Sequence, residues 1–547
     1  MVDSIEGKII GTWGGRLPFG ISDSTLKASY KIGIYTSKEK ALESAYFNKG
    51  AEVITKDKDG NFQVNKLDDN SIYNFTTNNI LNDNVTLSTK ITNKGQSIPE
   101  DTIVSLVTED DKELIKDGKG QYYIQTTSKI EETKSKAKIL GTEQMIKEID
   151  KLTGNTRSTR SNVKLLVNGP QAFKEIDKVL DSAKKSINIQ IFIFHDDETG
   201  WAVARKLVEK ARQGIDVRLL YDEGGTISDP GSAKILEYLR ENGVKTILEP
   251  MFGTPIKTKL IKRLLPFGVD EGLLATATDL LMKYNNHDHR KLIVVDGKTA
   301  ILGGMNFGDE YGKENNWHDL MVRIDGESVK DAQRAFISSW QRAGGKIESL
   351  EKWKELFPSE DTLKVKEQNA PITRILASNR SDNSIKTEIC YAIDNAQKNI
   401  YIANAYVTDE EIIKKIKEAA ARGVKVKMVF SDKTDVPIID QSHIRNMNKL
   451  FKAGVEIYVL NTENRKRMIH AKTMTVDGIW STVGSCNFTN RALNYNQEIN
   501  VSVIDKDFAS SLEERVFNQD LKDAVKMTKE LPEKLYYRIS EVLSNFA

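Results

Sequence analysis

The sequence predicts an α/β protein made of two tandem copies of one unit, preceded by a region of another kind. The phrase "HRKLIVVDG" (289–297) returns further along the chain as "HAKTMTVDG" (470–478). Upstream of both phrases, strand-like and helix-like patterns alternate, which is typical of a sheet with helices on both faces. We therefore expect two α/β halves that meet at a pseudo-twofold interface and share one active site, because clefts between domains are favoured places for sites.

Each half repeats one local plan. The segment "KARQGIDVRLLYD" (210–222) is typical of a helix end, with Gly214 as the cap, followed by a buried strand. The segment "AAARGVKVKMVFSD" (419–432) repeats this plan around Gly423. A strand before each first helix and a second helix–glycine–strand are expected at 186–194, 398–407, 238–248 and 450–460.

Residues 1–160 do not share the repeat. Short strand-like pieces broken by Asp, Asn and Gly turns are expected at 27–36, 50–56, 102–108 and 120–127. A helix is expected at roughly 134–152, and 153–162 is interpreted as a linker. We expect a small α+β or β-rich accessory domain of unknown role at 1–160, and the two repeated halves at 161–365 and 366–547.

Composition limits the class of protein. The chain has 547 residues, so two or three domains are expected, and its net charge of +2 argues against a dedicated nucleic-acid binder. The two cysteines, Cys390 and Cys486, cannot form a disulfide framework and favour a reducing compartment. We find neither a signal peptide nor a run of roughly 20 apolar residues that could span a bilayer. A cytoplasmic location is expected, with any membrane contact peripheral.

An insert of about 30 residues, roughly 250–283, distinguishes the first half from the second. It mixes lysines and an arginine with large apolar residues, a pattern that can lie in a lipid interface. The alternative, that its apolar face packs on the protein, is left open.

The repeated phrase belongs to a longer pattern, His-x-Lys-x4-Asp-x6-Gly-Gly/Ser-x-Asn. Positions two apart on a strand face the same side, so His289 should point with Lys291, and His470 with Lys472. The glycine-rich turns that follow let the backbone approach a ligand closely, and each ends in an asparagine donor. The candidate substrate-binding residues are Gly303, Gly304, Asn306, Gly484, Ser485 and Asn487.

Paired histidines, lysines and asparagines in one cleft indicate a phosphoryl site. Lysines and amide donors would bind the phosphoryl oxygens, one imidazole would attack phosphorus, and the other would act as acid and base. Neither a metal nor a cofactor is required. Asp319 and Glu498, at matched positions after the two motifs, are the expected partners that orient the imidazoles.

The remaining candidates are interpreted as structural. Asp296 and Asp477 each precede a glycine and are expected to anchor turns. Cys486 lies near the site, but a nucleophilic role would need a base that the pattern assigns elsewhere. No catalytic role is expected for the other four histidines, His195, His287, His318 and His443.

With these residues in view, the chain resembles the phospholipase D superfamily, and within it bacterial cardiolipin synthases, over roughly 163–525. The phrases that carry the resemblance are "HRKLIVVDGKTAILGGMNFGDEY", "WHDLMVRIDG", "HAKTMTVDG" and "VGSCNFTNRAL". The resemblance implies a ping-pong phosphatidyl transfer through a phosphohistidine, with His289 as nucleophile and His470 as general acid and base. It also implies phosphatidylglycerol as substrate, and a second lipid, another alcohol or water as acceptor.

Three other functions remain open at this point. A phospholipase D hydrolase would use the same residues with water as acceptor. A nuclease would use the same chemistry, but the near-neutral charge and the apolar insert argue against it. A non-catalytic lipid-binding protein is disfavoured because both motifs are complete.

Overall fold

The computed structural model describes 140–154, 157–229, 231–249, 287–314, 317–365, 367, 369–434, 440–462 and 468–532, and the backbone of strands between Ile9 and Gln125. The chain divides into two compact units. The first comprises Met1–Ser135 with Glu348–Leu350, and the second Lys136–Ile347 with Glu351–Ala547.

The first unit contains short antiparallel strands. Its main sheet has the order β1-β2-β8-β3-β4-β5, and β6 pairs with β7 and β9 with β10. The strands predicted at 27–36, 50–56, 102–108 and 120–127 correspond to β2, β3, β8 and β10. The bounds are β1 Ile9–Thr12, β2 Tyr30–Tyr35, β3 Glu52–Lys56, β4 Phe62–Lys66, β5 Val85–Leu87, β6 Thr92–Asn93, β7 Gln96–Ser97, β8 Ile103–Thr108, β9 Glu113–Lys116 and β10 Tyr122–Gln125.

The second unit begins with α3 (Glu143–Thr153) and continues with two α/β halves. Half 1 consists of β11 Thr159–Val167, α4 Asn168–Asp181, β12 Ser186–Ile191, α5 Glu198–Arg212, β13 Asp216–Asp222, α6 Glu223–Ser228, α7 Ser232–Glu241, β14 Lys245–Glu249, β15 Leu292–Val295, β16 Thr299–Gly303, α9 Asp309–Gly312, β17 Leu320–Gly326, α10 Val329–Arg342, α11 Leu350–Leu356 and α12 Glu360–Leu363.

Half 2 consists of β18 Ile372–Ser378, α13 Ser384–Asn395, β19 Asn399–Asn404, α14 Glu410–Ala421, β20 Lys425–Ser431, α15 Asp440–Lys452, β21 Glu456–Leu460, β22 Lys472–Val476, β23 Trp480–Gly484, α17 Asn490–Asn494, β24 Glu498–Ile504, α18 Lys506–Leu512, the π-helical turn η4 Glu513–Phe517, α19 Asn518–Asp523 and β25 Val525–Lys526.

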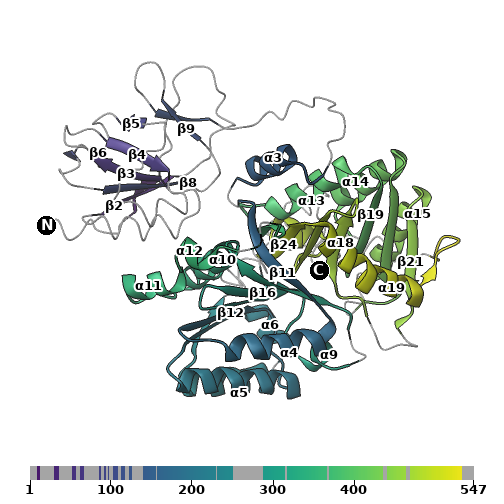
Figure 1. Ribbon diagram of the computed structural model, residues 1–547, viewed down its shortest axis with the longest axis horizontal. Coiled ribbons are helices and arrows are strands. Elements are labelled where there is room, and N and C mark those ends of the chain that lie inside the picture. The colour runs from purple at the N-terminus through teal and green to yellow at the C-terminus, as the bar shows by residue number, and fades with distance from the viewer. Residues whose placement is uncertain are drawn as a thin grey trace, which may run out of the picture. The chain divides into compact units, whose positions relative to one another are not determined.

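One long mixed sheet runs through both halves (Figure 1). Within the described part of the second unit, its fifteen strands have the order β14-β13-β12-β15-β16-β17-β11-β18-β24-β23-β22-β19-β20-β21-β25. Half 2 thus presents the strand order of half 1 in reverse, and the halves join where β11 pairs with β18 at Thr159–Thr373. The predicted mixed α/β architecture with two related halves is confirmed.

The predicted helix–glycine–strand units are present in both halves. Gly214 and Gly423 have φ of 84° and 90°, a conformation that glycine adopts without steric cost. In each case the glycine and the residue after it donate backbone hydrogen bonds to the last turn of the helix, α5 or α14. The helix therefore ends at the same place in both copies, and the chain turns directly into β13 or β20.

Helices cover both faces of the sheet in half 1. Ile187, Ile189 and Ile191 of β12 pack in a core with α4, α5 and α7. Between them, Asn188 faces the opposite side, where its amide donates to Gln333 of α10 at 3.3 Å. Figure 1 shows α4 and α5 on one side of β12 and α10 on the other. Both faces are buried, so all six residues of β12 are inaccessible to solvent.

Two aspartates tie the loops before β12 and β19 to the β15–β16 and β22–β23 hairpins. Asp296 and Asp477 have positive φ of 53° and 55°, which aspartate tolerates better than most residues. The Asp296 carboxylate accepts three backbone N–H bonds, each 2.8 Å long, from 184–186. The Asp477 carboxylate accepts the equivalent three from 397–399.

The segment between the N-terminal region and half 1 differs from its predicted form. The helix expected at roughly 134–152 is α3, and its Met145 and Ile149 are buried in the core of half 2. The interpretation of 153–162 as a linker is wrong in its second part, because β11 begins at Thr159 and pairs with β18. Sequence patterns identify turn-forming composition, but not a strand held in place by a distant partner.

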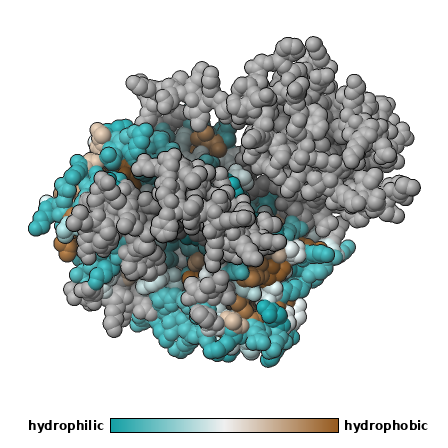
Figure 2. Space-filling view, turned by 180° about the vertical axis from the view of Figure 1, so that it is seen from behind, coloured by the Kyte–Doolittle hydropathy of each residue, from teal (hydrophilic) through white to brown (hydrophobic). Residues whose placement is uncertain are grey.

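None of the helices in the described ranges is both long enough and apolar enough to cross a membrane. Figure 2 shows hydrophilic residues over much of the described surface on one side of the molecule. The large hydrophobic side chains exposed among the described residues are Leu152, Leu248 and Val525. The amphipathic insert predicted at 250–283 lies outside the described residues.

Asp296 offers a test of this anchoring. Asp296→Ala should lower the free energy of unfolding by about 2–3 kcal/mol, because three backbone N–H groups lose a charged acceptor. Asp296→Asn should cost less, since it keeps one oxygen and tolerates positive φ. Urea denaturation followed by circular dichroism measures both. The control is the exposed Lys298→Ala in the same turn, and an equal loss in Asp296→Ala and this control would contradict the prediction.

Candidate active site

Each motif segment pairs through its backbone with a segment of the other half. In half 1, 287–289 runs parallel to 496–498 of half 2, with a bridge between Asp288 and Gln497. The His289 N–H donates to the Gln497 carbonyl at 2.9 Å, and the Gln497 N–H donates to the His287 carbonyl at 2.9 Å. Each of these two segments thus fixes the position and direction of the other.

The reciprocal contact joins the motif of half 2 to half 1. His318 forms a parallel bridge with Ile469, and its N–H donates to the Met468 carbonyl at 2.7 Å. The N–H of His470 in turn donates to the His318 carbonyl at 2.8 Å. His318, for which no catalytic role is expected, therefore positions the second motif with its backbone.

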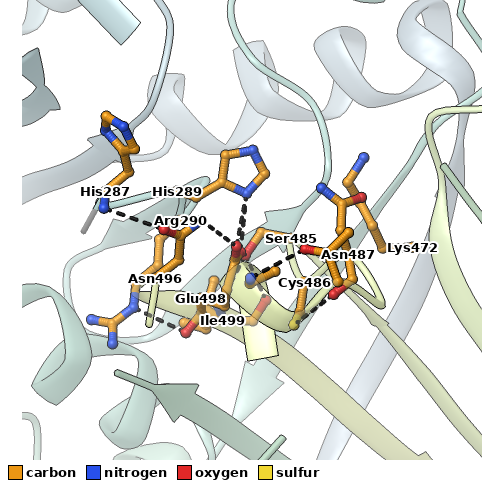
Figure 3. Close-up of polar contacts among 12 residues, drawn as sticks. His287, His289, Arg290, Lys472, Ser485, Cys486, Asn487, Asn496, Glu498 and Ile499 are labelled. Carbon is orange, nitrogen blue, oxygen red and sulfur yellow. Dashed lines mark hydrogen bonds and ion pairs between the residues drawn. The ribbon is translucent and has the colours of Figure 1, made fainter. Parts of the chain in front are cut away.

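This exchange pairs each imidazole with the carboxylate of the other half. His289 Nδ1 lies 3.0 and 3.1 Å from the two carboxylate oxygens of Glu498 (Figure 3). His470 Nδ1 lies 2.7 Å from Asp319 Oδ2. Both carboxylates are buried, and sequence reasoning names them without settling which imidazole each one meets. With Nδ1 paired in this way, Nε2 is the nitrogen of each ring left for a reacting group.

The four motif residues before the asparagines contact these carboxylates and the neighbouring strands. The Ser485 hydroxyl donates to Glu498 Oε2 at 2.5 Å. In half 1 the equivalent residue is Gly304, where an added Cβ would lie 2.3 Å from Asp319 Oδ1. Gly303 and Gly484 end β16 and β23, and a Cβ there would meet the adjacent strand at 2.2 and 2.1 Å. Of these predicted substrate-binding positions, Gly304 and Ser485 thus contact the orienting carboxylates, and Gly303 and Gly484 contact the neighbouring strands.

Both motif lysines are buried in the same region. Lys291 Nζ donates to the His289 carbonyl at 2.7 Å and lies 4.9 Å from the centre of the Phe192 ring. Lys472 Nζ donates to the His470 carbonyl and lies 2.9 Å from His470 Nδ1. Burial, helped by the charge of Lys472, lowers the pKa of Lys291 to about 7. An anionic ligand between the lysines would offset both effects and favour their charged forms.

His289 is neutral near pH 7 for the same physical reason. Burial is the largest cause that lowers its pKa to about 4, and the charges of Lys291 and Lys472 act in the same direction. The Glu498 carboxylate opposes them without reversing the shift. A neutral imidazole that donates Nδ1–H to Glu498 carries a lone pair on Nε2, which is the form that can attack an electrophile.

The two asparagines differ in their surroundings. Asn306 is buried, and its amide donates to the Tyr311 hydroxyl at 3.0 Å while its oxygen accepts from the Ile193 N–H. Asn487 is half-buried, and its Oδ1 has no hydrogen-bond partner among the described residues. Cys486 beside it is fully buried, and burial raises the pKa of its thiol well above the usual value, so the nucleophilic thiolate is disfavoured.

Aromatic rings that the motif does not include flank both imidazoles. The Phe192 ring meets His289 edge-on, with centroids 4.9 Å apart. Trp317 and Tyr311 lie 5.0 and 5.4 Å from His470. Trp317 stands two residues before Asp319, so strand alternation could have identified it, whereas Phe192 directly follows β12, which is distant in sequence. These rings exclude water and contribute to the burial of the imidazoles.

Arg290, which lies between His289 and Lys291 in the first motif, points away from the reacting groups and connects parts of the framework. Its buried guanidinium donates to the Glu498 carbonyl at 3.0 Å, to the Ser378 carbonyl at 2.8 Å and to the Ser339 hydroxyl at 3.1 Å. These partners belong to β24, β18 and α10. One side chain therefore connects the first motif to half 2 and to the helix behind the sheet.

Two further histidines lie apart from these pairs. His195 is held between Asp229 and Glu310, at 2.8 Å from each, and these carboxylates raise its pKa to about 9. His443 is buried against Phe430, and burial lowers its pKa to about 4.

The electrostatic account of His289 can be tested by nuclear magnetic resonance. Lys291→Met should raise the pKa of His289 above about 4, because it removes a repelling charge while keeping the side chain apolar and buried. Glu498→Gln should lower it further, because it removes the opposing carboxylate charge. The proton shift of His289 Cε1–H against pH reports both, with Lys298→Met as the distant control. An unchanged pKa in Lys291→Met would contradict this assignment of cause.

Comparisons with known proteins agree with this geometry. A family model described as "Cardiolipin synthase, PLD-like domain" matches 176–340 and 389–521, which is more than half of the chain. Cardiolipin synthase 1 of Bacillus cereus is 30% identical over 393 residues, which cover 69% of this chain and 70% of that protein. Cardiolipin synthase 2 of Staphylococcus epidermidis is 30% identical over 381 residues, which cover 68% and 70%.

A solved structure shares the fold. The phosphatidylserine synthase of Haemophilus influenzae Rd KW20 superposes with a TM-score of 0.53 at 16% identity, covering 73% of this chain and 96% of that one. The match to the family model and the identity to the curated synthases together settle the membership. The chain belongs to the phospholipase D-like family of cardiolipin synthases and is an enzyme of that family.

Proposed function

We propose that the chain is a phosphatidyltransferase of cardiolipin synthase type, with a single active site that the two halves share about a pseudo-twofold axis. The observation that carries the proposal is the exchange of carboxylates, in which Glu498 holds His289 and Asp319 holds His470. Each motif histidine thus takes its carboxylate from the other half. A phosphodiester placed between the two Nε2 atoms would meet one imidazole on each side.

In the first half-reaction, His289 is the nucleophile. Its Nε2 lone pair attacks the phosphorus of the donor lipid, a P–N bond forms, and the P–O bond to the headgroup alcohol breaks. His470 donates a proton to the leaving oxygen, and Asp319 stabilises the ring orientation. The assignment of His289 follows the family resemblance, and its pKa of about 4 supports it, since attack requires a neutral imidazole.

In the second half-reaction, His470 acts as the base. It accepts the proton of the incoming hydroxyl, whose oxygen attacks phosphorus as the P–N bond to His289 breaks. Lys291, Lys472, Asn306 and Asn487 bind the phosphoryl oxygens, where negative charge grows in both transition states. The buried lysines are compatible with a site that is completed by an anionic ligand, and the half-buried Asn487 can donate to that ligand through its amide NH2 group.

Phosphatidylglycerol is the proposed substrate, because relatives that are 30% identical to this chain are named cardiolipin synthases. A second phosphatidylglycerol or another alcohol is the acceptor. The basic apolar insert at 250–283 is proposed as the segment that contacts the membrane surface from the cytoplasm. The division into an accessory domain at 1–160 and halves at 161–365 and 366–547 remains a prediction.

Incubation with phosphatidylglycerol vesicles tests the reaction. Mass spectrometry should detect cardiolipin and glycerol, and His289→Ala and His470→Ala should each lower the rate at least about a thousandfold, because each removes one of the two reacting groups. Lys298→Ala, a surface change, should match the unchanged protein. Phosphatidic acid as the main product would identify a hydrolase instead, and a reaction that survives either histidine change would contradict the shared site.

A separate experiment tests which histidine is the nucleophile and which is the acid and base. His470→Asn removes both the acid of the first step and the base of the second. With a radiolabelled phosphatidyl-p-nitrophenol donor, whose leaving group needs no proton, the phosphatidyl group should therefore accumulate on His289. The label should be acid-labile and stable to base, as a P–N bond is, and it should be absent from His289→Asn. Label retained by His289→Asn and lost from His470→Asn would reverse the two roles.

A further inference from the structure

A second imidazole–carboxylate pair stands beside the first motif. His287 Nδ1 lies 2.9 Å from Asp222 Oδ1, and the other Asp222 oxygen accepts the N–H of Asp288 at 2.8 Å. His287 is buried, with 10% of its side chain exposed. The motif gives it no lysine partner, and its side chain takes no part in the transfer described above.

Half 2 contains the same structural position without this pair. There Ser431, which ends β20 as Asp222 ends β13, accepts the N–H of Ile469 at 2.9 Å through its hydroxyl. Met468 stands where half 1 has His287. In half 2 a serine hydroxyl thus provides the acceptor for this backbone contact. Asp222 supplies a second oxygen, which holds the His287 ring and also accepts the N–H groups of Gly224 and Gly225.

The surroundings of His287 are shaped for the ring and place it near the reacting imidazole. A Cβ on Gly224 would lie 2.2 Å from His287 Cε1, so only glycine leaves room there. The Phe192 ring contacts both histidines edge-on, with centroids 5.7 Å from His287 and 4.9 Å from His289. Figure 3 shows both imidazoles projecting to the same side of the segment that carries Asn496 and Glu498.

The ring has one nitrogen left for a ligand. Nδ1 is committed to Asp222, and no described residue hydrogen-bonds to Nε2. A ring fixed at one nitrogen by a carboxylate offers its other nitrogen in a defined direction. When both ring nitrogens carry a hydrogen, Nδ1–H meets Asp222 and Nε2–H can donate to an anionic phosphoryl oxygen.

We propose that His287, oriented by Asp222, is a further substrate-binding residue that donates from Nε2 to the phosphoryl group held at His289. The inference rests on the proposed function and adds a residue to that site. It makes the site asymmetric, because the His470 side has Met468 and Ser431 in the equivalent places. The bonds made and broken in the transfer are unchanged, since His287 contributes a hydrogen bond and no covalent step.

Two amide substitutions separate this role from a structural one. His287→Gln places an amide donor near the position of Nε2, whereas His287→Asn places one near Nδ1 and keeps the bond to Asp222. His287→Met and Asp222→Ser copy the residues that half 2 uses at the same positions. Asp222→Ser also removes an acceptor of the Gly224 and Gly225 N–H groups, so His287→Met is the cleaner of the two. Lys298→Ala is the surface control, and thermal unfolding checks each variant.

Rates are measured with phosphatidylglycerol vesicles and with bis(p-nitrophenyl) phosphate, a phosphodiester that needs no lipid surface. On both substrates, kcat/KM should fall about tenfold or more in His287→Asn, His287→Met and Asp222→Ser, because a hydrogen bond to a charged group is lost or misdirected. His287→Gln should retain the larger part of the activity.

The outcomes distinguish this inference from the proposed function. Activity of His287→Asn equal to or above that of His287→Gln would overturn the role of Nε2 while the unchanged protein still transfers phosphatidyl groups. Full activity in His287→Met with an unaltered melting temperature would do the same. Absence of lipid transfer in the unchanged protein would overturn the proposed function, and the order of the variants on the chromogenic phosphodiester would still decide the role of His287.

Discussion

The reciprocal backbone contact between the halves is the constraint on which the site depends. Segment 287–289 pairs with 496–498, and 317–319 runs beside 468–470. Each pairing brings a histidine of one half to a carboxylate of the other within hydrogen-bonding distance. Because both pairings are parallel and short, a shift of one half along the other would separate both pairs together. Arg290 and α10 reinforce this register from behind.

Burial gives these groups their chemistry. Two lysines and two imidazoles face two carboxylates in a region closed by Phe192, Trp317 and Tyr311. In water, His289 would be partly protonated near neutral pH, and here desolvation keeps it neutral. The same desolvation makes Lys291 costly to charge without a ligand, so binding an anion and charging this lysine favour each other. Affinity for a phosphoryl group and readiness for attack therefore have one physical origin.

Much of this arrangement could be predicted from the sequence because it is encoded locally. The capping glycines, the repeated strands and the His-x-Lys motifs depend on spacing and side-chain alternation, which the sequence displays directly. The crosswise pairing could not be predicted, because Glu498 stands at the matched distance after His470 and its contact with His289 depends on how the halves meet. The start of β11 could not be predicted either, because its polar composition is typical of a linker and its pairing with β18 is distant in sequence. The contact of Phe192 with His289 likewise joins residues that are distant in sequence. Ser485 looks like a ligand-binding residue in the motif, yet its hydroxyl faces Glu498.

The reversed strand order of the long sheet has a consequence for how the two copies diverge. Two identical subunits that met through this surface would form an isologous dimer, in which every change appears on both sides of the axis. Covalent fusion removes that symmetry requirement. Gly304 leaves room for Asp319, whereas Ser485 donates a hydrogen bond to the longer Glu498. Half 2 likewise has Ser431 where half 1 has Asp222. A chain that contains both copies can thus assign attack to one half and proton transfer to the other, and each half can then adapt to its own task.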